Sequence, residues 1–366
     1  WPDLANSLDF VEEQACSEKS SAIRPRKDWQ SNIERSWAYF TTKNGHGPTT
    51  VPDTDVKKVI NTIKNFSSSV QSPKLNKLKK YDLQDITFCV FVRIDNEERA
   101  DNLKAMINFY RLYCKNVKFI ISEDGLVPKI PNIIDLTEND IYTFNYNSAE
   151  WKKCEGYNKC IKLAKTNIVN LIDTDCIIHP QQLLTAARSL NADANAALIY
   201  PYNGLFLCAE REVKDEFCST LDYDNTLMKR FPSQFDNYTC SRDHDVDQLK
   251  QYLNEVSDGI LIGHIDSKGG CVMGRRDNLI KCNGFNPNFI GWGYEDDEMP
   301  NRVRQLGFNV DRIEGKKKIC WHLHHFDGTG SLKAEQPNYK HNKNVYDTVN
   351  DLDKKQLQQY ITGWIM

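Results

Sequence analysis

Short apolar segments alternate with helix-patterned segments from residue 86 onward. Ile86-Thr-Phe-Cys-Val-Phe-Val92 and residues 117–121 are apolar runs rich in β-forming residues, and residues 98–114 between them have helical spacing. A second helical segment at 150–165 precedes a third apolar run at 167–172. Because strands that alternate with helices pair in parallel, we predict an open α/β sheet flanked by helices.

The pattern is less regular on both sides of this unit. Residues 1–80 are polar and end in a lysine-rich run, which predicts a helical extension and linker. We place the α/β domain at 81–335 and a helical tail at 336–366, in which residues 342–365 have the spacing of one amphipathic helix. The chain is therefore predicted to be one large domain with two additions.

Composition narrows the classes of partner. The 366 residues are 40% hydrophobic and 11% aromatic, enough for a substantial core, and the net charge is -3. This balance gives no reason to expect nucleic acid or a membrane surface as a partner. No apolar run approaches the roughly 20 residues of a membrane span. Since the chain starts at Trp1 rather than Met, we expect a fragment from which an anchor or partner domain could have been cut away.

The cysteine pattern indicates in which cellular compartment the protein is expected. None of the twelve forms a CxxC pair, and four lie in apolar runs: Cys89, Cys176, Cys208 and Cys320. This favours reduced core thiols and a cytoplasmic location. Two glycosylation sequons, at Asn65 and Asn237, keep a Golgi-type lumen open as the alternative.

Polar residues follow each predicted strand, where open α/β sheets bind their ligands. The first strand ends in Arg93-Ile-Asp95, the second in Ser122-Glu-Asp-Gly125 and the third in Asp173-Thr-Asp175. Carboxylates at i and i+2 of an extended chain point to the same side, and a pair of them suits Mg²⁺ or Mn²⁺. The alternative is an ordinary turn, because Asp is common after strands.

Three of the eight histidines lie in His322-Leu-His-His325, after another short apolar run. Imidazoles bind Mn²⁺ and Zn²⁺, so a second metal-ligating segment is predicted here. A zinc hydrolase is the alternative class, since Asp327 lies nearby. The residue order argues against it, because no histidine follows that aspartate directly.

The segment Phe289-Ile-Gly-Trp-Gly-Tyr-Glu-Asp-Asp-Glu-Met299 places a tryptophan between two glycines and before four acids. The glycines predict a loop that bends or moves. The acids, Glu295 to Glu298, fit the first turn of a helix, where negative charge is favourable. On this evidence alone, a surface helix remains an alternative to a functional loop.

Together these segments resemble a GT-A-fold glycosyltransferase, in particular the β-1,4-galactosyltransferase family and bacterial capsule and chondroitin-polymerase domains. The most specific match is Asn283-Gly-Phe-Asn-Pro-Asn-Phe-Ile-Gly-Trp-Gly-Tyr-Glu-Asp-Asp297. Residues 88–99 resemble the opening strand of the capsule-type enzymes, and the likeness covers roughly residues 85–330. It implies a Rossmann-like nucleotide-diphospho-sugar transferase fold with an open mixed sheet.

The resemblance also implies an activity and a ligand set. The activity is metal-dependent, inverting transfer of a hexose or N-acetylhexosamine from a UDP-sugar to a saccharide hydroxyl, which forms a β-glycosidic bond. The cofactor is Mn²⁺, with Mg²⁺ as the alternative, held by Asp175, His322 and His325, and His324 is the spare histidine. The residues implied for donor binding are Arg93, Asp95, Glu123 or Asp124, Asp173, Gly270 and Trp292.

The same resemblance makes Asp296 the catalytic base and assigns Trp292, Glu295 and Asp297 to the acceptor. A carboxylate in this role must reach the acceptor hydroxyl and remove its proton. Its acidic neighbours Glu295 and Asp297 are expected to raise the pKa of Asp296.

Two other functions remain open. Retaining polypeptide N-acetylgalactosaminyltransferases have a similar W-G-x-E stretch, but they carry D-x-H in place of Asp173-Thr-Asp175 and Asn in place of Asp296, which favours inversion here. A non-catalytic sugar or nucleotide-sugar binding module would not need a base. Ser267 stands where the galactosyltransferases have a tyrosine beside the donor's C2 substituent, so UDP-GalNAc and UDP-GlcNAc compete with UDP-Gal and UDP-Glc as donors.

Overall fold

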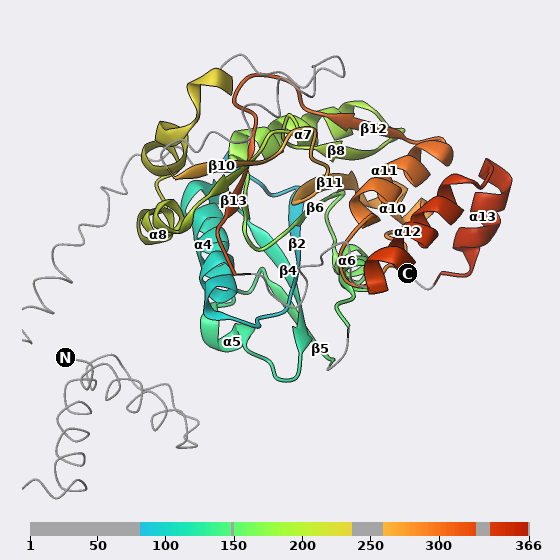
Figure 1. Cartoon of the computed structure of the whole chain (residues 1–366), viewed down its shortest axis with the longest axis horizontal. Coiled ribbons are helices and arrows are strands. Elements are labelled where there is room, and N and C mark those ends of the chain that lie inside the picture. The colour runs from blue at the N-terminus through green and yellow to red at the C-terminus, as the bar shows by residue number, and fades with distance from the viewer. Residues whose placement is uncertain (1–80, 148–149, 236–258, 327–336, 365–366) are drawn as a thin grey trace, which may run out of the picture. The chain divides into compact units, whose positions relative to one another are not determined.

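The computed structural model describes residues 81–147, 150–235, 259–326 and 337–364 (Figure 1). The predicted extension at 1–80 and both glycosylation sequons lie outside these residues. The three strands predicted first along the chain form next to one another in the order β6-β2-β4, and all pair in parallel. The expected parallel unit is therefore confirmed.

A seven-stranded sheet is the centre of the fold, in the order β12-β8-β11-β6-β2-β4-β5. Strand β11 runs antiparallel to both of its neighbours, so the sheet is mixed, as the resemblance implies. The strands are β2 (Ile86–Val92), β4 (Lys118–Gly125), β5 (Ile141–Tyr146), β6 (Ile168–Ile172), β8 (Ala196–Tyr200), β11 (Cys271–Arg275) and β12 (Asn309–Arg312).

A second sheet has the order β10-β9-β13-β7. Its strands are β7 (Cys176–Ile177), β9 (Phe206–Ala209), β10 (Ile260–His264) and β13 (Cys320–Leu323). The antiparallel register of β13 and β7 sets His322 opposite Cys176, one residue after Asp175. This pairing joins two segments that are far apart in the sequence. A short parallel pair, β1 (Tyr81–Asp82) and β3 (Cys114–Lys115), lies apart from both sheets.

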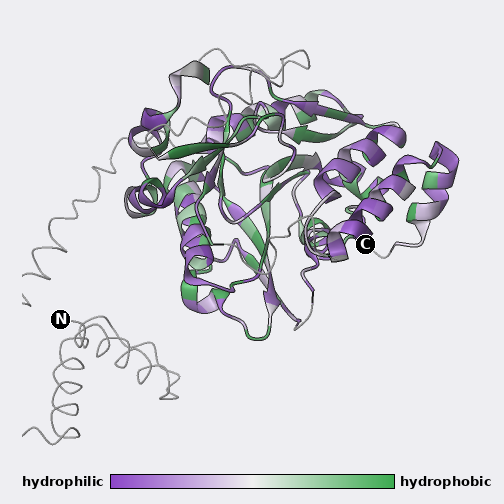
Figure 2. Ribbon diagram, in the orientation of Figure 1, coloured by the Kyte–Doolittle hydropathy of each residue, from purple (hydrophilic) through white to green (hydrophobic). Residues whose placement is uncertain are grey.

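Side chains of alternate residues in β2 enter two different hydrophobic clusters. Phe88 and Val90 belong to one cluster, and Cys89 and Phe91 belong to the other. Such alternation is expected of a strand covered on both faces. Figure 2 shows hydrophobic residues along the central strands and mainly hydrophilic residues on α11 and α12.

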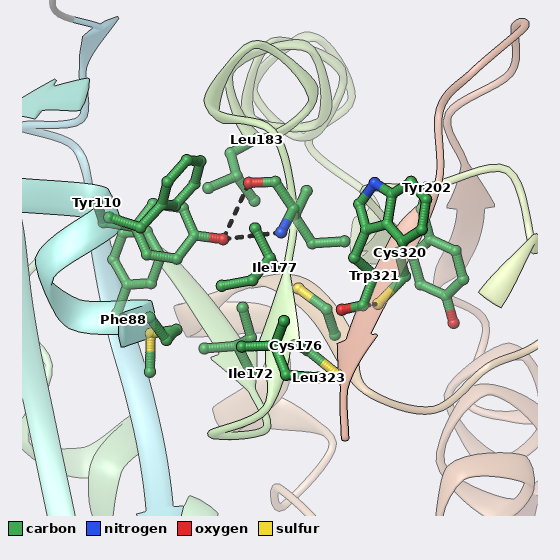
Figure 3. Packing of buried hydrophobic residues seen from close by; sticks show 14 of the residues in the cluster. Phe88, Tyr110, Ile172, Cys176, Ile177, Leu183, Tyr202, Cys320, Trp321 and Leu323 are labelled. Atoms are coloured by element: carbon green, nitrogen blue, oxygen red, sulfur yellow. Dashed lines mark hydrogen bonds between the residues drawn. The ribbon is translucent and has the colours of Figure 1, made fainter. Parts of the chain in front are cut away.

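In the first cluster, the Tyr110 hydroxyl donates to the Ile178 carbonyl and accepts from the Ile178 amide, both at 3.0 Å (Figure 3).

Helices cover both faces of the central sheet (Figure 1). They are α4 (Glu97–Tyr113), α5 (Ile130–Ile133), α6 (Lys153–Leu163), α7 (Pro180–Ala192), α8 (Arg211–Thr220), α10 (Arg276–Lys281), α11 (Glu295–Gln305), α12 (Pro337–Asn350) and α13 (Lys354–Thr362). Three short turns, η3 (Tyr223–Leu227), η4 (Met228–Arg230) and η5 (Ser233–Phe235), follow α8. Within these described residues, no helix is both long and apolar enough to cross a membrane.

The single helix predicted for residues 342–365 is wrong. The structure has two helices there, because Asp353 starts α13 with a capping box. Its carboxylate accepts from the Gln356 amide at 2.8 Å, and the Gln356 side chain accepts from the Asp353 amide at 2.9 Å. Two satisfied amides at this point favour a new helix start over continuation.

Close approach of α6 to β2 depends on Gly156. A Cβ atom at this position would lie 2.1 Å from the Phe91 ring, which is far inside van der Waals contact. The first turns of α6 are therefore held directly against the central sheet.

Candidate active site

A cavity of about 610 Å³ lies where the ends of β6 and β13 face the start of α11. The predicted site residues that line it are Asp173, Asp175, Gly270, Trp292, Glu295, Asp296, Asp297, His322 and His325. They come from four separate parts of the chain. The fold therefore brings together the D-x-D, the tryptophan loop, the acids and the histidines.

One wall of the cavity, called the metal-ligating wall below, has a cluster of three side chains that could together hold a metal ion. The Nε2 atoms of His325 and His322 lie 3.1 and 3.7 Å from the two carboxylate oxygens of Asp175, and one ligand atom from each residue fits within 4.8 Å. Backbone bonding fixes the arrangement, because the Leu323 amide donates to the Asp175 carbonyl at 2.7 Å. His324 is outside this cluster.

The charges in the cluster suit a cation. Burial alone would raise the pKa of Asp175, but His322 and His325 outweigh it and hold the pKa below its usual range. Burial lowers the pKa of His322, which favours the neutral, ligating form of imidazole. One carboxylate and two imidazoles form a donor set that Mn²⁺ accepts. These residues fit the expected metal.

A second wall of the cavity consists of acids at the start of α11, as predicted for a first turn. Glu295 is almost fully buried, and its carboxylate accepts from the Gly293 amide at 2.7 Å. Its main contact is therefore with the tryptophan loop rather than with open cavity. Glu298, the last of the four acids, instead pairs with the buried Arg302 at 2.6 Å.

Lys153, which the sequence interpretation missed, lies among the acids. Its Nζ is 3.4 Å from Asp173, 3.5 Å from Glu295 and 3.9 Å from Asp296. Burial would lower the pKa of Lys153, but the three carboxylates raise it well above its ordinary value. One turn further along α6, the Tyr157 hydroxyl donates to Asp173 at 2.8 Å. A single ammonium thus links the first acid of the D-x-D to the acids of α11.

Asp296 has a raised pKa, of about 8. Burial is the largest cause; Lys153 opposes it, while Glu295, Asp173 and Asp297 raise the pKa further. The expected direction is correct, although partial burial of this side chain, which is 30% exposed, contributes more than the neighbouring acids. A Cβ atom at Gly269 would lie 2.9 Å from the Asp296 Oδ2, so the glycine leaves room for this carboxylate.

Trp292 lies at the cavity with 47% of its surface exposed. The residues around it have left-handed backbone conformations: φ is 71° at Gly291, 113° at Gly293 and 67° at Tyr294. Glycine adopts this region readily, but tyrosine does not. The tight bend predicted from the two glycines is therefore present and continues into Tyr294.

Four residues predicted to bind the donor do not line the cavity: Arg93, Asp95, Glu123 and Asp124. Arg93 pairs with Asp124, which also accepts from the Asn147 side chain at 3.1 Å. The Glu123 carboxylate accepts from the Lys129 amide at 2.8 Å and from the Tyr142 hydroxyl at 2.5 Å. Their role in holding uridine stays a prediction.

Arg99 lines the cavity instead, and the sequence interpretation did not single it out. It lies in the first turn of α4, where its Nε is 3.1 Å from the Asp95 carboxylate. This position one turn beyond Asp95 places a guanidinium in the cavity wall.

The comparisons with known proteins point to the β-1,4-galactosyltransferases. A protein-family profile described as "N-terminal domain of galactosyltransferase" matches residues 264–326. Human beta-1,4-galactosyltransferase 6 is 37% identical over 133 residues, which are 31% of this chain and 35% of that protein. Mouse beta-1,4-galactosyltransferase 4 is 31% identical over 94 residues, 25% of this chain and 26% of that protein. The chain thus spans about a third or less of these relatives.

Solved structures give a broader but weaker likeness. The catalytic domain of Drosophila beta-1,4-galactosyltransferase 7 with xylobiose has a TM-score of 0.39 and 15% identity, over 72% of this chain and 79% of that one. A mutant of that enzyme with manganese, UDP-Gal and xylobiose also has a TM-score of 0.39, at 14% identity, over 71% and 79%.

The segment matched by the family profile contains Gly270, Trp292, Asp296, His322 and His325. The chain is therefore similar to galactosyltransferases in a part that contributes to both walls of the cavity, whereas Asp173 and Asp175 lie outside the matched residues. The resemblance stated from the sequence is confirmed.

Proposed function

We propose that this protein is an inverting, metal-dependent glycosyltransferase that moves a hexose or N-acetylhexosamine from a UDP-sugar to a saccharide hydroxyl. The observation that carries the proposal is one cavity with a metal-ligating cluster on one wall and Asp296, with a raised pKa, on the other. The matched segment of the galactosyltransferase family supports the same reaction class.

Asp175, His322 and His325 would hold Mn²⁺, or Mg²⁺ as the alternative. A bound divalent ion offsets the negative charge that develops on a departing diphosphate. Among the described residues, Arg99, Lys153 and Lys268 are the Lys and Arg side chains that line the cavity. All three have acid partners: Lys268 pairs with Asp297 at 2.6 Å, Arg99 pairs with Asp95 at 3.1 Å, and Lys153 lies among three acids. We assign Arg99 to the diphosphate because its charge acts on the proposed metal cluster, where it helps to lower the pKa of Asp175.

Asp296 is the general base of the proposed reaction. Its carboxylate accepts the proton of the acceptor hydroxyl while that oxygen attacks the anomeric carbon and the bond to the diphosphate breaks. The bonding electrons leave with the diphosphate, and attack from the opposite face converts an α-linked donor into a β-linked product. Lys153 favours the charged form of Asp296 that can accept a proton.

The donor's C2 substituent is expected to face Ser267. This small residue lines the cavity, and its hydroxyl accepts from the Gly269 amide at 3.3 Å. A serine leaves more space than the tyrosine of the galactosyltransferases, so an N-acetyl group is compatible with the cavity. We therefore propose UDP-GalNAc or UDP-GlcNAc alongside UDP-Gal and UDP-Glc.

A panel of these four UDP-sugars with Mn²⁺ tests the proposal without an acceptor. Calorimetry measures binding, and release of UDP measures slow hydrolysis. At least one donor is expected to bind and be hydrolysed, a chelator is expected to abolish hydrolysis, and added Mn²⁺ to restore it. Binding without hydrolysis in every case would favour the non-catalytic module, and chelator-resistant hydrolysis would refute the metal role of Asp175.

A further inference from the structure

The tryptophan loop, residues 290–294, is held by helix α12, in which Tyr339 lines the cavity and Asn342 does not. Tyr294 has a left-handed backbone conformation that a residue with a Cβ atom adopts reluctantly. Such conformations persist only where surrounding contacts enforce them. The contacts on this loop therefore show what holds Trp292 in place.

Asn342 of α12 supplies the contacts to the loop backbone. Its Oδ1 accepts from the Ile290 amide at 3.0 Å, and its Nδ2 donates to the carbonyls of Ile290 and Trp292 at 2.8 and 3.1 Å. The side chain is fully buried, and the bond from the Ile290 amide fixes which end of the carboxamide is the acceptor. One side chain thus binds the loop on both sides of Gly291.

Two tyrosines of α12 hold the far end of the loop. The Tyr294 ring packs on Tyr339 and Tyr346, with centroids 5.1 and 5.3 Å away, and its hydroxyl is 3.1 Å from that of Tyr339. A Cβ atom at Gly293 would lie 3.3 Å from the Tyr339 ring, so the loop fits closely against this helix.

Attachment of α12 to the rest of the fold does not depend on Asn342. Val345 and Val349 of the same helix are buried in a hydrophobic cluster with Met299 and Val303 of α11. The polar contacts of Asn342 go instead to the loop backbone. The Asn342 side chain therefore determines the conformation of the loop and not the position of α12.

We propose that Asn342, assisted by Tyr339, is a positioning residue that sets where Trp292 stands at the cavity. Asn342 does not itself line the cavity. The effect on substrates rests on the proposed function, in which Trp292 contacts the sugar of the donor. UDP has no sugar on its diphosphate, so its binding should not depend on Asn342.

The test compares Asn342→Asp with Asn344→Asp, a matched change at an exposed position two residues along α12. The first change keeps the acceptor but removes both donated bonds and turns a carboxylate toward two carbonyls. We expect KM for UDP-sugar hydrolysis to rise about tenfold, with UDP affinity in Mn²⁺ within about twofold of the parent. Asn344→Asp should match the parent in both.

A second readout does not require activity. Acrylamide quenching of Trp292, obtained as the difference between each protein and its Trp292→Phe version, should increase for Asn342→Asp only. If the Asn342 variant fails to fold, Tyr339→Phe gives a milder test, because it removes the hydroxyl contact with Tyr294. Since Tyr339 also lines the cavity, the readout for this variant is quenching alone, which should increase.

Unchanged quenching and KM in the folded Asn342 variant would overturn the inference. So would a parallel loss of UDP affinity, which would show damage to the whole cavity. A parent protein that neither binds UDP nor hydrolyses any UDP-sugar would refute the proposed function, while the quenching comparison would still decide whether Asn342 positions Trp292.

Discussion

The two walls of the cavity are built in different ways. The metal-ligating wall comes from strand ends, where pairing of β7 with β13 places His322 next to Asp175. The acidic wall comes from a loop with left-handed residues and from the first turn of α11. Asp175 is nearly buried, whereas Trp292 is about half exposed. One wall is therefore fixed by the sheets, and the other depends on side-chain contacts from elsewhere.

The core explains why the metal-ligating wall should be rigid. Cys176, Cys320 and Trp321 are fully buried in the same cluster, within two residues of the proposed ligands Asp175 and His322 (Figure 3). Moving a ligand would therefore disturb packing that stabilises the whole fold. On the acidic wall, substitutions can alter the chemistry while the core stays intact. Substitutions in the metal-ligating wall should therefore reduce metal binding, whereas substitutions in the acidic wall should reduce turnover and leave metal binding unchanged.

The largest expected effect comes from Asp296→Asn. The amide cannot accept the hydroxyl proton, so transfer or hydrolysis should fall about a hundred- to ten-thousandfold. UDP affinity in Mn²⁺, measured by calorimetry, should stay close to that of the parent because the metal-ligating wall is untouched. Asp351→Asn, at an exposed position, is the control. Substantial transfer by the Asp296 variant would show that another group is the base.

Asp175→Asn should affect the metal-ligating wall and therefore Mn²⁺ binding. Removing the one carboxylate of the cluster should weaken Mn²⁺ binding by at least about a hundredfold, since even partners outside the ligand set contribute ten- to hundredfold. Direct titration with Mn²⁺ measures this without any substrate. Asp277→Asn removes an exposed surface acid and should leave Mn²⁺ affinity unchanged. Equal affinities for both variants would place the metal elsewhere.

A smaller effect is expected from Gly269→Ala. The added Cβ would lie 2.9 Å from the Asp296 Oδ2 and must displace the carboxylate, so turnover should fall about tenfold or more. Mn²⁺ affinity should not change. Gly363→Ala is the matched control, since the nearest atom to its added Cβ is 3.9 Å away. A Gly269 variant with normal turnover would mean that the position of Asp296 is not critical.

The last expected effect concerns stability against pH and is measured independently of turnover. The pKa of Asp296 rises from 3.8 to about 8 on folding, so the folded state holds the proton more tightly. Its contribution to stability is present at low pH and is lost as pH rises from about 4 to about 8. Urea unfolding of the metal-free protein measures the free energy of unfolding at pH 5 and at pH 8. From pH 5 to pH 8 this free energy should fall more for the parent than for Asp296→Asn. Equal losses would contradict the raised pKa.

The elements of the metal-ligating wall were predictable from local sequence. Apolar runs bounded by polar residues identify the strands, and the D-x-D and the histidines directly follow or end such runs. Each of these patterns can be recognised from a few consecutive residues. The meeting of the two segments was not predictable in the same way, because it depends on the antiparallel pairing of β13 with β7 in the second sheet, which sets His322 opposite Cys176.

Much of the acidic wall was not predictable in this way. The acids and the bend showed in the sequence, but Lys153 lies 142 residues before its partner Glu295, and Asn342 lies 52 residues after Ile290. No local periodicity identifies such partners. Likewise, nothing near Glu123 indicates that its carboxylate accepts from the amides of residues 129 and 130 at the start of α5. The helix start at Asp353, by contrast, had a readable Asp-Lys-Lys-Gln capping signal.

Gly156 affects the charges of the cavity as well as the packing of α6. Because it has no side chain, α6 can rest on Phe91, and Lys153 at the head of that helix reaches Asp173 and Asp296 together. Even a methyl group at this position would push the helix outward and withdraw a positive charge from between negative ones. A residue that touches no substrate would then govern how strongly the two sides of the cleft repel each other.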